Sequence, residues 1–551
     1  MSKELIESHR QRLEQLKDLR SPYDADYQEL SQFLLFRRGV FAGDTQGSRA
    51  RRRSKSLDSR PVKALKNLAA LMQGGLTSPA RPWFGLATRD KDLNEWGPVK
   101  RWLDYVKDVM YMAYSRSNFY DSIHTLYEEL IGFGSGAMFE QPDATQLLRF
   151  YPATVGSYWL ASSDRNAVDT VYRIFTQSLR QVATRFGAER LSPQHQDILQ
   201  KRPYTNIDLV HVVGPRDAWD SRSKNVTNLP FYDLYFEKDC DHNLLQESGH
   251  NEQPWLVTRW DVSGTDTYGY GPGHDVLADV KQLTAVRRDL TAAISKELNP
   301  PMQTPTGMNQ RLNMLPGASN PRPRAGDKIE PLFQIQPRIR ESVELQQDIR
   351  QAILEGFFND LLIFILNKPN VTATEIAERQ EEKLLLLGPV IERQQSELLD
   401  PITDRTFGIL NRLGLIPPAP QELQGMELKV EYISLLAQAQ KLVGTQAVDQ
   451  VVQSALGAAQ FDPSVLDKIN LDEFIDIKAD LLGTRGKLVR TDEEVQIIRQ
   501  NRAKERAAAN AMVAAQQGAQ TAKTLSDTPM GESNALDAVM GGGVMSPQQQ
   551  R

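Results

Sequence analysis

The sequence of 551 residues contains a single cysteine, Cys240. One thiol cannot form a disulfide within the chain, so no disulfide framework holds this fold together. The scarcity of cysteine instead suits a reducing compartment. At this length we expect about three or four domains, each able to bury its own core.

Long apolar runs are also absent. The strongest, LLIFIL at residues 361–366, is far shorter than the roughly 20 residues that a membrane span needs. The N-terminus, MSKELIESHRQRLEQ, is charged and amphipathic and lacks the apolar core of a secretory signal. With 40% hydrophobic and 25% charged residues, the composition predicts a cytosolic globular protein that makes no contact with a membrane.

The chain has no excess of positive charge, since its formal net charge is −5. No global basic field therefore favours nucleic acid, although local charge could still contact DNA. One basic stretch is GDTQGSRARRRSKSLDSR at residues 43–60. It is either a solvated loop or a contact for phosphate or a partner, and the sequence leaves both interpretations open.

Strong catalytic signatures are missing as well. Residues 483–488 (GTRGKL) lack the spacing and the hydroxyl of a phosphate-binding loop, and no HExxH motif is present. GFGSG at 132–136 is not a nucleophile elbow, and we interpret it as a flexible turn. DCDH at 239–242 could supply at most two metal ligands from one face of a strand, so a polar turn is the better interpretation. We therefore predict no enzyme, no cofactor and no metal, and favour a structural or assembly role.

The first half of the chain changes from a helical pattern to a strand pattern. Helices are expected at 3–20, ended by Pro22, at about 56–76, and twice within 97–131. Trp83 and Phe84 follow Pro79 and Pro82 and should bury a large apolar area in a turn. From 137 to 262, short runs rich in aromatic and β-branched residues predict antiparallel strands, with a short helix at 182–186.

The second half places a proline-rich module between two helices. Residues 273–298 show a helical apolar stripe, and 340–366 show another that turns Val343, Ile349, Ile353, Phe357 and Leu361 inward. Between them, eight prolines over 299–338 rule out a helix and indicate loops and short strands. Six basic and two acidic residues give residues 299–340 a net charge of +4.

A long helix follows a turn at 367–370 (NKPN). Thr372 and Glu375 form a capping box, and an apolar stripe then runs to Leu413 with a charged opposite face. That face is formed by Glu378, Arg379, Glu382, Arg393, Glu397 and Arg405. Gly388 and Pro389 predict a kink, and Gly414 ends the helix. A strand is expected at 427–434, helices over 435–524, and disorder in the Gly- and Gln-rich tail at 525–551.

Several of these segments resemble the portal, or head-to-tail connector, proteins of short-tailed phages. The resemblance lies in RPWF (81–84), YGYG (268–271), VTATEI (371–376) with Arg379 and Glu382, Gly388-Pro389, Glu397, and LLDPI (398–402) with Arg405. The block around TATE is the most specific of these, and the resemblance covers about 60–520.

The resemblance implies an α+β fold, mainly helical, in a ring of identical subunits, usually twelve. It would divide the chain into a wing at 1–272, a stem helix at 273–298, a clip at 299–338, a second stem helix at 339–362 and a tunnel loop at 363–371. Residues 372–434 would form a long kinked helix and a wing strand, and 435–524 a helical crown.

The same resemblance implies a function. The ring would lie at a vertex of the virion capsid after assembly in the host cytoplasm, and double-stranded DNA would be packaged and ejected through it. Channel contacts would come from Asn367, Lys368 and Asn370, without reading base sequence. Arg311, Arg322, Arg324 and Lys328 of the clip would dock the terminase packaging motor and then the tail adaptor. Major capsid and scaffolding proteins would be further partners.

One alternative remains at this stage. The chain could be another structural protein of the head–tail junction, such as an adaptor or an internal core protein. Such proteins would lack the order of helix, proline-rich module, helix, turn and long helix.

Overall fold

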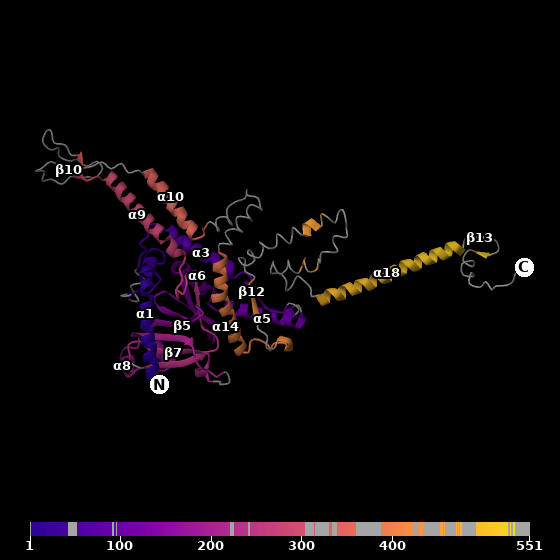
Figure 1. Cartoon of the computed structure of the whole chain (residues 1–551), viewed down its shortest axis with the longest axis horizontal. Coiled ribbons are helices and arrows are strands. Elements are labelled where there is room, and N and C mark those ends of the chain that lie inside the picture. The colour runs from indigo at the N-terminus through magenta and orange to yellow at the C-terminus, as the bar shows by residue number, and fades with distance from the viewer. Residues whose placement is uncertain are drawn as a thin grey trace. The chain divides into compact units, whose positions relative to one another are not determined.

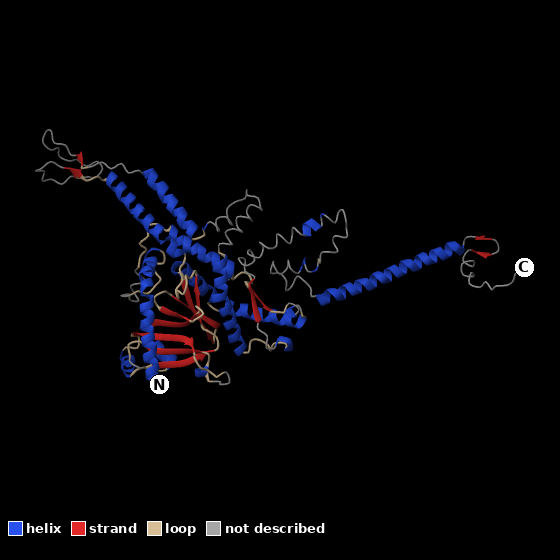
Figure 2. Cartoon of the chain, viewed as in Figure 1, coloured by secondary structure: helices blue, strands red, loops and turns tan. Residues whose placement is uncertain are grey.

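The computed structural model describes most of the N-terminal three quarters of the chain. The described residues are 2–41, 44, 52–90, 93–94, 96–220, 225–240, 243–303, 313, 330–332, 339–359, 387–423, 428–432, 452–455, 457, 470, 472, 474–475, 492–526, 529–530 and 533–534. Contacts divide the chain into two units, residues 1–87 with 102–469 and residues 88–101 with 470–551. Helices and sheets are mixed, so the α+β class is confirmed (Figure 2).

The first unit begins with helices. They are α1 (Ser2–Phe33), α3 (Arg60–Leu76), α5 (Gly97–Arg116), whose first residues belong to the second unit, and α6 (Phe119–Phe133). The prediction that Pro22 ends the first helix is wrong, because α1 continues through it. Leu13 and Leu16 before the proline and Tyr27 and Leu30 after it are all buried. Their burial outweighs the roughly 3 kcal/mol that an interior proline costs a helix.

Two antiparallel sheets occupy residues 135–259, as the short aromatic runs predict. The larger has the order β4-β5-β6-β7-β8 and the smaller β3-β2-β9. Their strands are β2 (Ser135–Asp143), β3 (Leu147–Ala153), β4 (Tyr158–Ser162), β5 (Val168–Ser178), β6 (Asn206–Pro215), β7 (Phe231–Glu237), β8 (Leu244–His250) and β9 (Trp255–Arg259). The expected short helix is α7 (Leu179–Phe186), and α8 (Pro193–Lys201), which the sequence analysis missed, follows it.

Both faces of the larger sheet carry a core, because alternate residues of a strand point to opposite sides. On one face, Val210 and Val212 pack with Ile6, Leu13 and Leu16 of α1. The opposite face has its own cluster, contributed by α7, its flanking segment and the strands: Leu179, Val182, Phe186, Leu191, Ile207, Leu209, Tyr235 and Leu245. Helix α1 thus covers one side of this sheet and α7 the other.

The remaining elements follow in the expected order. They are α9 (Pro272–Leu298), β10 (Met302–Gln303), β11 (Glu330–Pro331), α10 (Ile339–Gly356), α13 (Gly388–Gln394), the π-helical turn η3 (Gln395–Leu399), α14 (Asp400–Arg412) and β12 (Leu428–Tyr432). The last strand pairs with β1 (Phe84–Thr88). In the second unit, α18 (Asp492–Ser526) precedes β13 (Pro529–Met530) and β14 (Ser533–Asn534), which pair. Most of the expected crown and tail lies outside the described residues.

Trp83 and Phe84 lie in an aromatic cluster with no exposed surface. The Tyr111 hydroxyl holds this turn, since it accepts hydrogen bonds from the Trp83 and Phe84 amides at 2.7 and 2.8 Å. The Trp83 ring lies 5.9 Å from that of Tyr114 and 6.1 Å from that of Phe119. The turn after Pro82 therefore fastens β1 to α5 and α6.

We expect Trp83→Ala to lower the free energy of unfolding by about 3–5 kcal/mol, because it leaves a cavity where the indole was. Denaturant titration of the purified protein measures the change. Trp219→Ala is the matched control, since that side chain is 48% exposed and its loss should change stability by less than about 0.5 kcal/mol. Equal stability of the two variants would contradict the assignment of Trp83 as an anchor.

Candidate functional site: a two-helix arm and its anchorage

The two helices that flank the proline-rich module, α9 and α10, pack along each other (Figure 1). Near the body their apolar side chains are buried: Val276, Val280 and Leu283 of α9, and Ile349 and Ile353 of α10. At this end α9 also contacts α1 and α6, and α10 contacts α3. Every residue of α9 after Thr284 is partly or fully exposed. The pair, called the arm below, is rooted at one end and exposed at the other.

A contact between two glycine-rich segments fixes the start of the arm. Gly134 ends α6 in the left-handed conformation, with φ +77°. A Cβ atom on Gly134 would lie 2.3 Å from the Gly269 carbonyl oxygen, and one on Gly269 equally close to the Gly134 oxygen. Gly273, in the first turn of α9, meets the Gly132 oxygen at the same distance. GFGSG is therefore a backbone socket for the start of α9, and its interpretation as a flexible turn is wrong.

A buried carboxylate joins the two helices of the arm. Asp58, which precedes α3, is 5% exposed. Its Oδ2 accepts from Arg287 of α9 at 2.9 Å and from Nη2 of Arg350 of α10 at 2.7 Å, while its Oδ1 accepts from the Arg60 amide at 2.9 Å. Burial alone would raise the Asp58 pKa, but the Arg60 amide and both guanidinium groups outweigh it, so the net pKa is lowered.

The outer part of the arm and the adjoining module carry exposed apolar side chains. Those more than a third exposed are Leu298, Leu332, Ile339, Val343 and Leu345. The prediction that Val343 points inward like Ile349 is thus wrong for the single subunit, where it is 38% exposed. Such a group of exposed large side chains is typical of a surface that another molecule covers.

The proline-rich module closes where it leaves the arm. Met302 of β10 pairs with Pro331 of β11, and Gln303 with Glu330. The Leu332 amide also donates to the Pro301 carbonyl at 2.8 Å. The chain therefore departs and returns at one point, and the module forms a single excursion from the arm.

A second anchorage lies between the helix formed by α13, η3 and α14 and the small sheet, in which β9 is an edge strand. Glu397 of η3 accepts from the Arg259 amide at 2.9 Å and from its guanidinium at 2.7 Å. Gln394 accepts from the Thr258 hydroxyl and donates to the Arg259 carbonyl. Helix side chains thus satisfy polar groups of the edge strand and protect it from pairing with another chain.

Among the described residues, the charged face of this helix, opposite its apolar stripe, is not left to solvent. Arg405 is 1% exposed and donates to the carbonyls of Glu140 and Glu252, both at 2.9 Å. Burial raises the pKa of the Glu140 carboxyl to about 7, although Arg405 and the Thr406 hydroxyl lower it. Arg405 binds the body because Glu140 of β2 and Glu252, before β9, offer carbonyls that a guanidinium satisfies.

The helix is irregular at η3. Pro401, in the first turn of α14, has no amide to donate to the preceding turn, and the π-helical turn lies directly before it. Gly388 and Pro389 occupy the first turn of α13, and the residues expected on the other side of their kink lie outside the described ones. The expected end of the helix is confirmed, since α14 stops at Arg412 and Gly414 has φ +71°.

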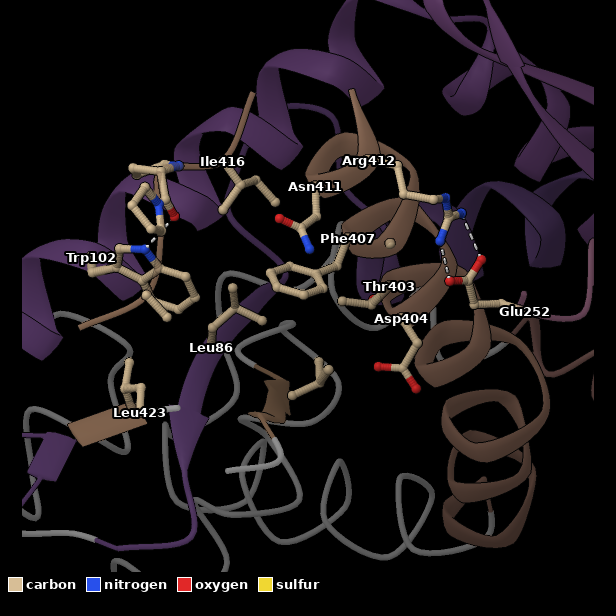
Figure 3. A pocket seen from close by; sticks show the side chains of 15 residues that line it. Leu86, Trp102, Glu252, Thr403, Asp404, Phe407, Asn411, Arg412, Ile416 and Leu423 are labelled. Atoms are coloured by element: carbon tan, nitrogen blue, oxygen red, sulfur yellow. Dashed lines mark hydrogen bonds and ion pairs between the residues drawn. The ribbon is translucent and has the colours of Figure 1, made fainter. Parts of the chain in front are cut away.

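A pocket beside α14 offers no evident chemistry. Leu86, Trp102, Phe407 and Ile416 form apolar walls, and Figure 3 shows the charged side chains at one side. Arg412 and Glu252 pair through two contacts of 2.6 and 2.8 Å, which leaves Asp404 as the other charged lining residue. An ion pair and one carboxylate do not make a catalytic group set.

Most of the residues predicted to bind DNA or partners lie outside the described ones. They are Asn367, Lys368 and Asn370 for the channel, Arg311, Arg322, Arg324 and Lys328 for the clip, and the capping pair Thr372 and Glu375. The sequence analysis missed the role of Asp58 because its arginine partners lie 229 and 292 positions away. Among the helices in the described ranges, none is long and apolar enough to cross a bilayer.

Comparison with known proteins shows what the chain is similar to. The family model described as "Bacteriophage head to tail connecting protein" matches residues 7–489. The portal protein of Salmonella phage epsilon15 is 38% identical over 535 residues, 96% of each chain. A probable portal protein of Bordetella phage BPP-1 is 35% identical over 534 residues, 95% of this chain and 96% of its own.

We expect Asp58→Asn to lower the free energy of unfolding by about 3 kcal/mol at neutral pH, because Arg350 loses its charged partner at a buried site. The Asp58 pKa is depressed in the fold, so this contribution is present above the unfolded pKa and disappears as pH falls through the folded one. Denaturant titrations at neutral and acidic pH, with exposed Asp289→Asn as control, measure it. A loss that is equal at both pH values, or matched by the control, would exclude the bridge.

Proposed function

The chain belongs to the family of bacteriophage head-to-tail connecting proteins, and on that premise we propose that it is the portal subunit of a short-tailed phage. Copies would form a ring at one capsid vertex, and double-stranded DNA would be packaged and ejected through the central channel. Two relatives that span nearly the whole chain carry the names portal protein and probable portal protein. The structural observation that carries the proposal is the arm, rooted in the body and exposed with apolar side chains at its outer end.

The arm suits a ring because of what its outer end leaves uncovered. A heterologous contact repeated by rotation closes when the rotation divides a full turn. In such a ring, arms stand side by side around the axis, and the exposed side chains of one arm can pack against the next. Two helices per subunit then line a rigid channel, which a single subunit cannot enclose.

The parts of the chain take their proposed roles from this arrangement. Residues 1–272 and 372–434 form the wing with its long helix, 273–298 and 339–362 the stem, 299–338 the clip, 363–371 the tunnel loop and 435–524 the crown. Two observations support this division. The close contact of Gly134 with Gly269 marks the boundary between wing and stem, and the pairing of β10 with β11 marks the base of the clip. In this division the clip protrudes furthest along the arm from the wing.

DNA passes such a channel only if the protein holds it weakly. Each phosphate neutralised by a cation strengthens binding, so a subunit with net charge −5 suits sliding. Lys368 of the tunnel loop, with Asn367 and Asn370, would touch phosphates without reading bases. The clip, with a net charge of +4 over 299–340, would bind the packaging motor and later the tail adaptor through Arg311, Arg322, Arg324 and Lys328. A pull-down of both partners with charge-reversed Arg322 and Arg324 addresses that role.

Ring formation tests the proposal directly. We expect Leu345→Glu to fold as the wild type does but to shift the protein from rings towards single subunits, because a charge would enter the contact between arms. Gln347→Glu, which adds the same charge at an exposed polar position of the same helix, is the matched control. Negative-stain microscopy and light scattering measure the assemblies. A wild-type protein that remains monomeric at high concentration would refute the proposed function.

A second prediction concerns the channel. We expect Lys368→Ala to leave ring assembly intact but to alter the length or yield of packaged DNA, because one phosphate contact per subunit is lost. Packaging assays and the size of the encapsidated genome measure the effect. Lys201→Ala, whose side chain is 70% exposed on α8, is the control and should package normally. Normal packaging by both variants would remove Lys368 from the mechanism.

A further inference from the structure

A histidine, a carboxylate and the single cysteine meet at one end of the larger sheet. His195 lies in the first turn of α8, Glu237 ends β7, and Cys240 lies in the turn that leads to β8. The three candidate ligand atoms all lie within 4.8 Å of one another. His195 Nδ1 is 2.9 Å from Glu237 Oε2 and 3.6 Å from Cys240 Sγ. The interpretation of residues 239–242 as no more than a polar turn is therefore incomplete, because the partners of Cys240 come from elsewhere in the chain.

The surroundings hold this group in place. His195 is 8% exposed and Glu237 has no exposed surface, while Cys240 is half-buried. The Ser192 amide donates to Glu237 Oε1 at 3.1 Å, and the Ser192 hydroxyl lies 3.2 Å from Cys240 Sγ. Arg10 of α1 donates to the carbonyls of Lys238 and Cys240 at 3.0 and 2.5 Å, which fixes the turn that carries the thiol.

The arrangement does not fit a catalytic relay. In a thiol–imidazole–carboxylate relay, the thiol and the carboxylate bond to different ring nitrogens of the histidine. Here both lie against Nδ1. The sulfur, oxygen and nitrogen atoms lie within 4.8 Å of one another, close enough to bind a single ion together.

From this arrangement we propose that His195, Glu237 and Cys240 bind a zinc ion, with water in the fourth position. Zinc–ligand bonds of about 2.0 to 2.3 Å at tetrahedral angles separate ligand atoms by roughly 3.3 to 3.6 Å. The 3.6 Å distance from Cys240 Sγ to His195 Nδ1 already matches. The 2.9 Å distance from Glu237 Oε2 to the same nitrogen is shorter, so the carboxylate oxygen must move away from the ring to make room for an ion. A thiolate with an imidazole selects zinc over calcium and magnesium, which prefer oxygen ligands.

A zinc ion here would bind a helix to the sheet. It would join the start of α8 to the end of β7 and to the turn before β8, the outermost strand of the sheet. The apolar cluster of that face, which includes Leu191 and Leu245, lies beneath these elements. The expected role is therefore to stabilise the sheet, and it depends neither on DNA nor on ring assembly.

Cobalt titration of the purified full-length protein tests the site. Because Cys240 is the only cysteine, a thiolate-to-cobalt absorption band can arise from no other residue of the chain. We expect the band to appear with about one cobalt ion per chain and to disappear when zinc is added in excess. Cys240→Ser should abolish the band and the rise in melting temperature that zinc produces in the wild type.

Further variants separate a specific site from chance binding. His195→Gln should abolish the band, whereas His124→Gln, a half-exposed histidine on α6, should keep it. Circular dichroism shows whether each variant is folded, and if His195→Gln unfolds, the nearly isosteric Cys240→Ser decides alone. Cobalt binding without the band, or a band that survives His195→Gln, would overturn the proposal, as would the absence of binding.

Discussion

The arm depends on a steric constraint at its root. There the backbone approaches itself so closely at Gly134 and Gly269 that neither position can carry a side chain. A Cβ atom on either glycine would lie only 2.3 Å from the carbonyl oxygen of the other. Any other residue at these positions would therefore push the start of α9 away from the end of α6. The left-handed turn at Gly134 fits the same requirement, since glycine adopts it without strain. The socket thereby sets the direction of α9 over 27 residues, because a small rotation at the root becomes a large displacement at the tip.

Charges then fix what the glycines leave free. Asp58 binds one arginine on each arm helix, and Glu397 and Arg405 tie the helix formed by α13, η3 and α14 to the small sheet. Each bond joins elements more than a hundred positions apart. Such pairs add little net stability compared with apolar packing, but breaking one leaves a buried charge without compensation. They therefore penalise other relative positions of the helices, a property that would suit a subunit whose copies fit together in the proposed ring.

Local patterns predicted the elements but not these joints. Apolar periodicity and proline density are properties of neighbouring residues. The strands of 137–262, the order of first arm helix, proline-rich module and second arm helix, and the end of the helix at Gly414 could therefore be predicted from the sequence. Pro22 misled because burial on both sides of it outweighs the local rule. The burial of Arg405 was not predicted because a charged residue in an amphipathic helix usually faces water. Only the tertiary structure shows that the carbonyl oxygens of Glu140 and Glu252 accept hydrogen bonds from its guanidinium. The pairing of the two glycine motifs, the arginines of Asp58 and the cluster around Cys240 all join distant segments that no spacing rule connects.

In the proposed ring, the fixed root of the arm and its exposed outer end would act together. Fully covering a large apolar side chain contributes about 1.5–3 kcal/mol, and the outer arm presents several that are only partly covered. A flexible arm would lose much of that gain to the ordering of its helices on assembly. An arm already fixed by the glycine socket and Asp58 has less freedom left to lose, so more of the apolar energy is available for association. In the proposed ring, the rigidity of the root would therefore strengthen the contacts between neighbouring arms, although the two ends of an arm share no residue.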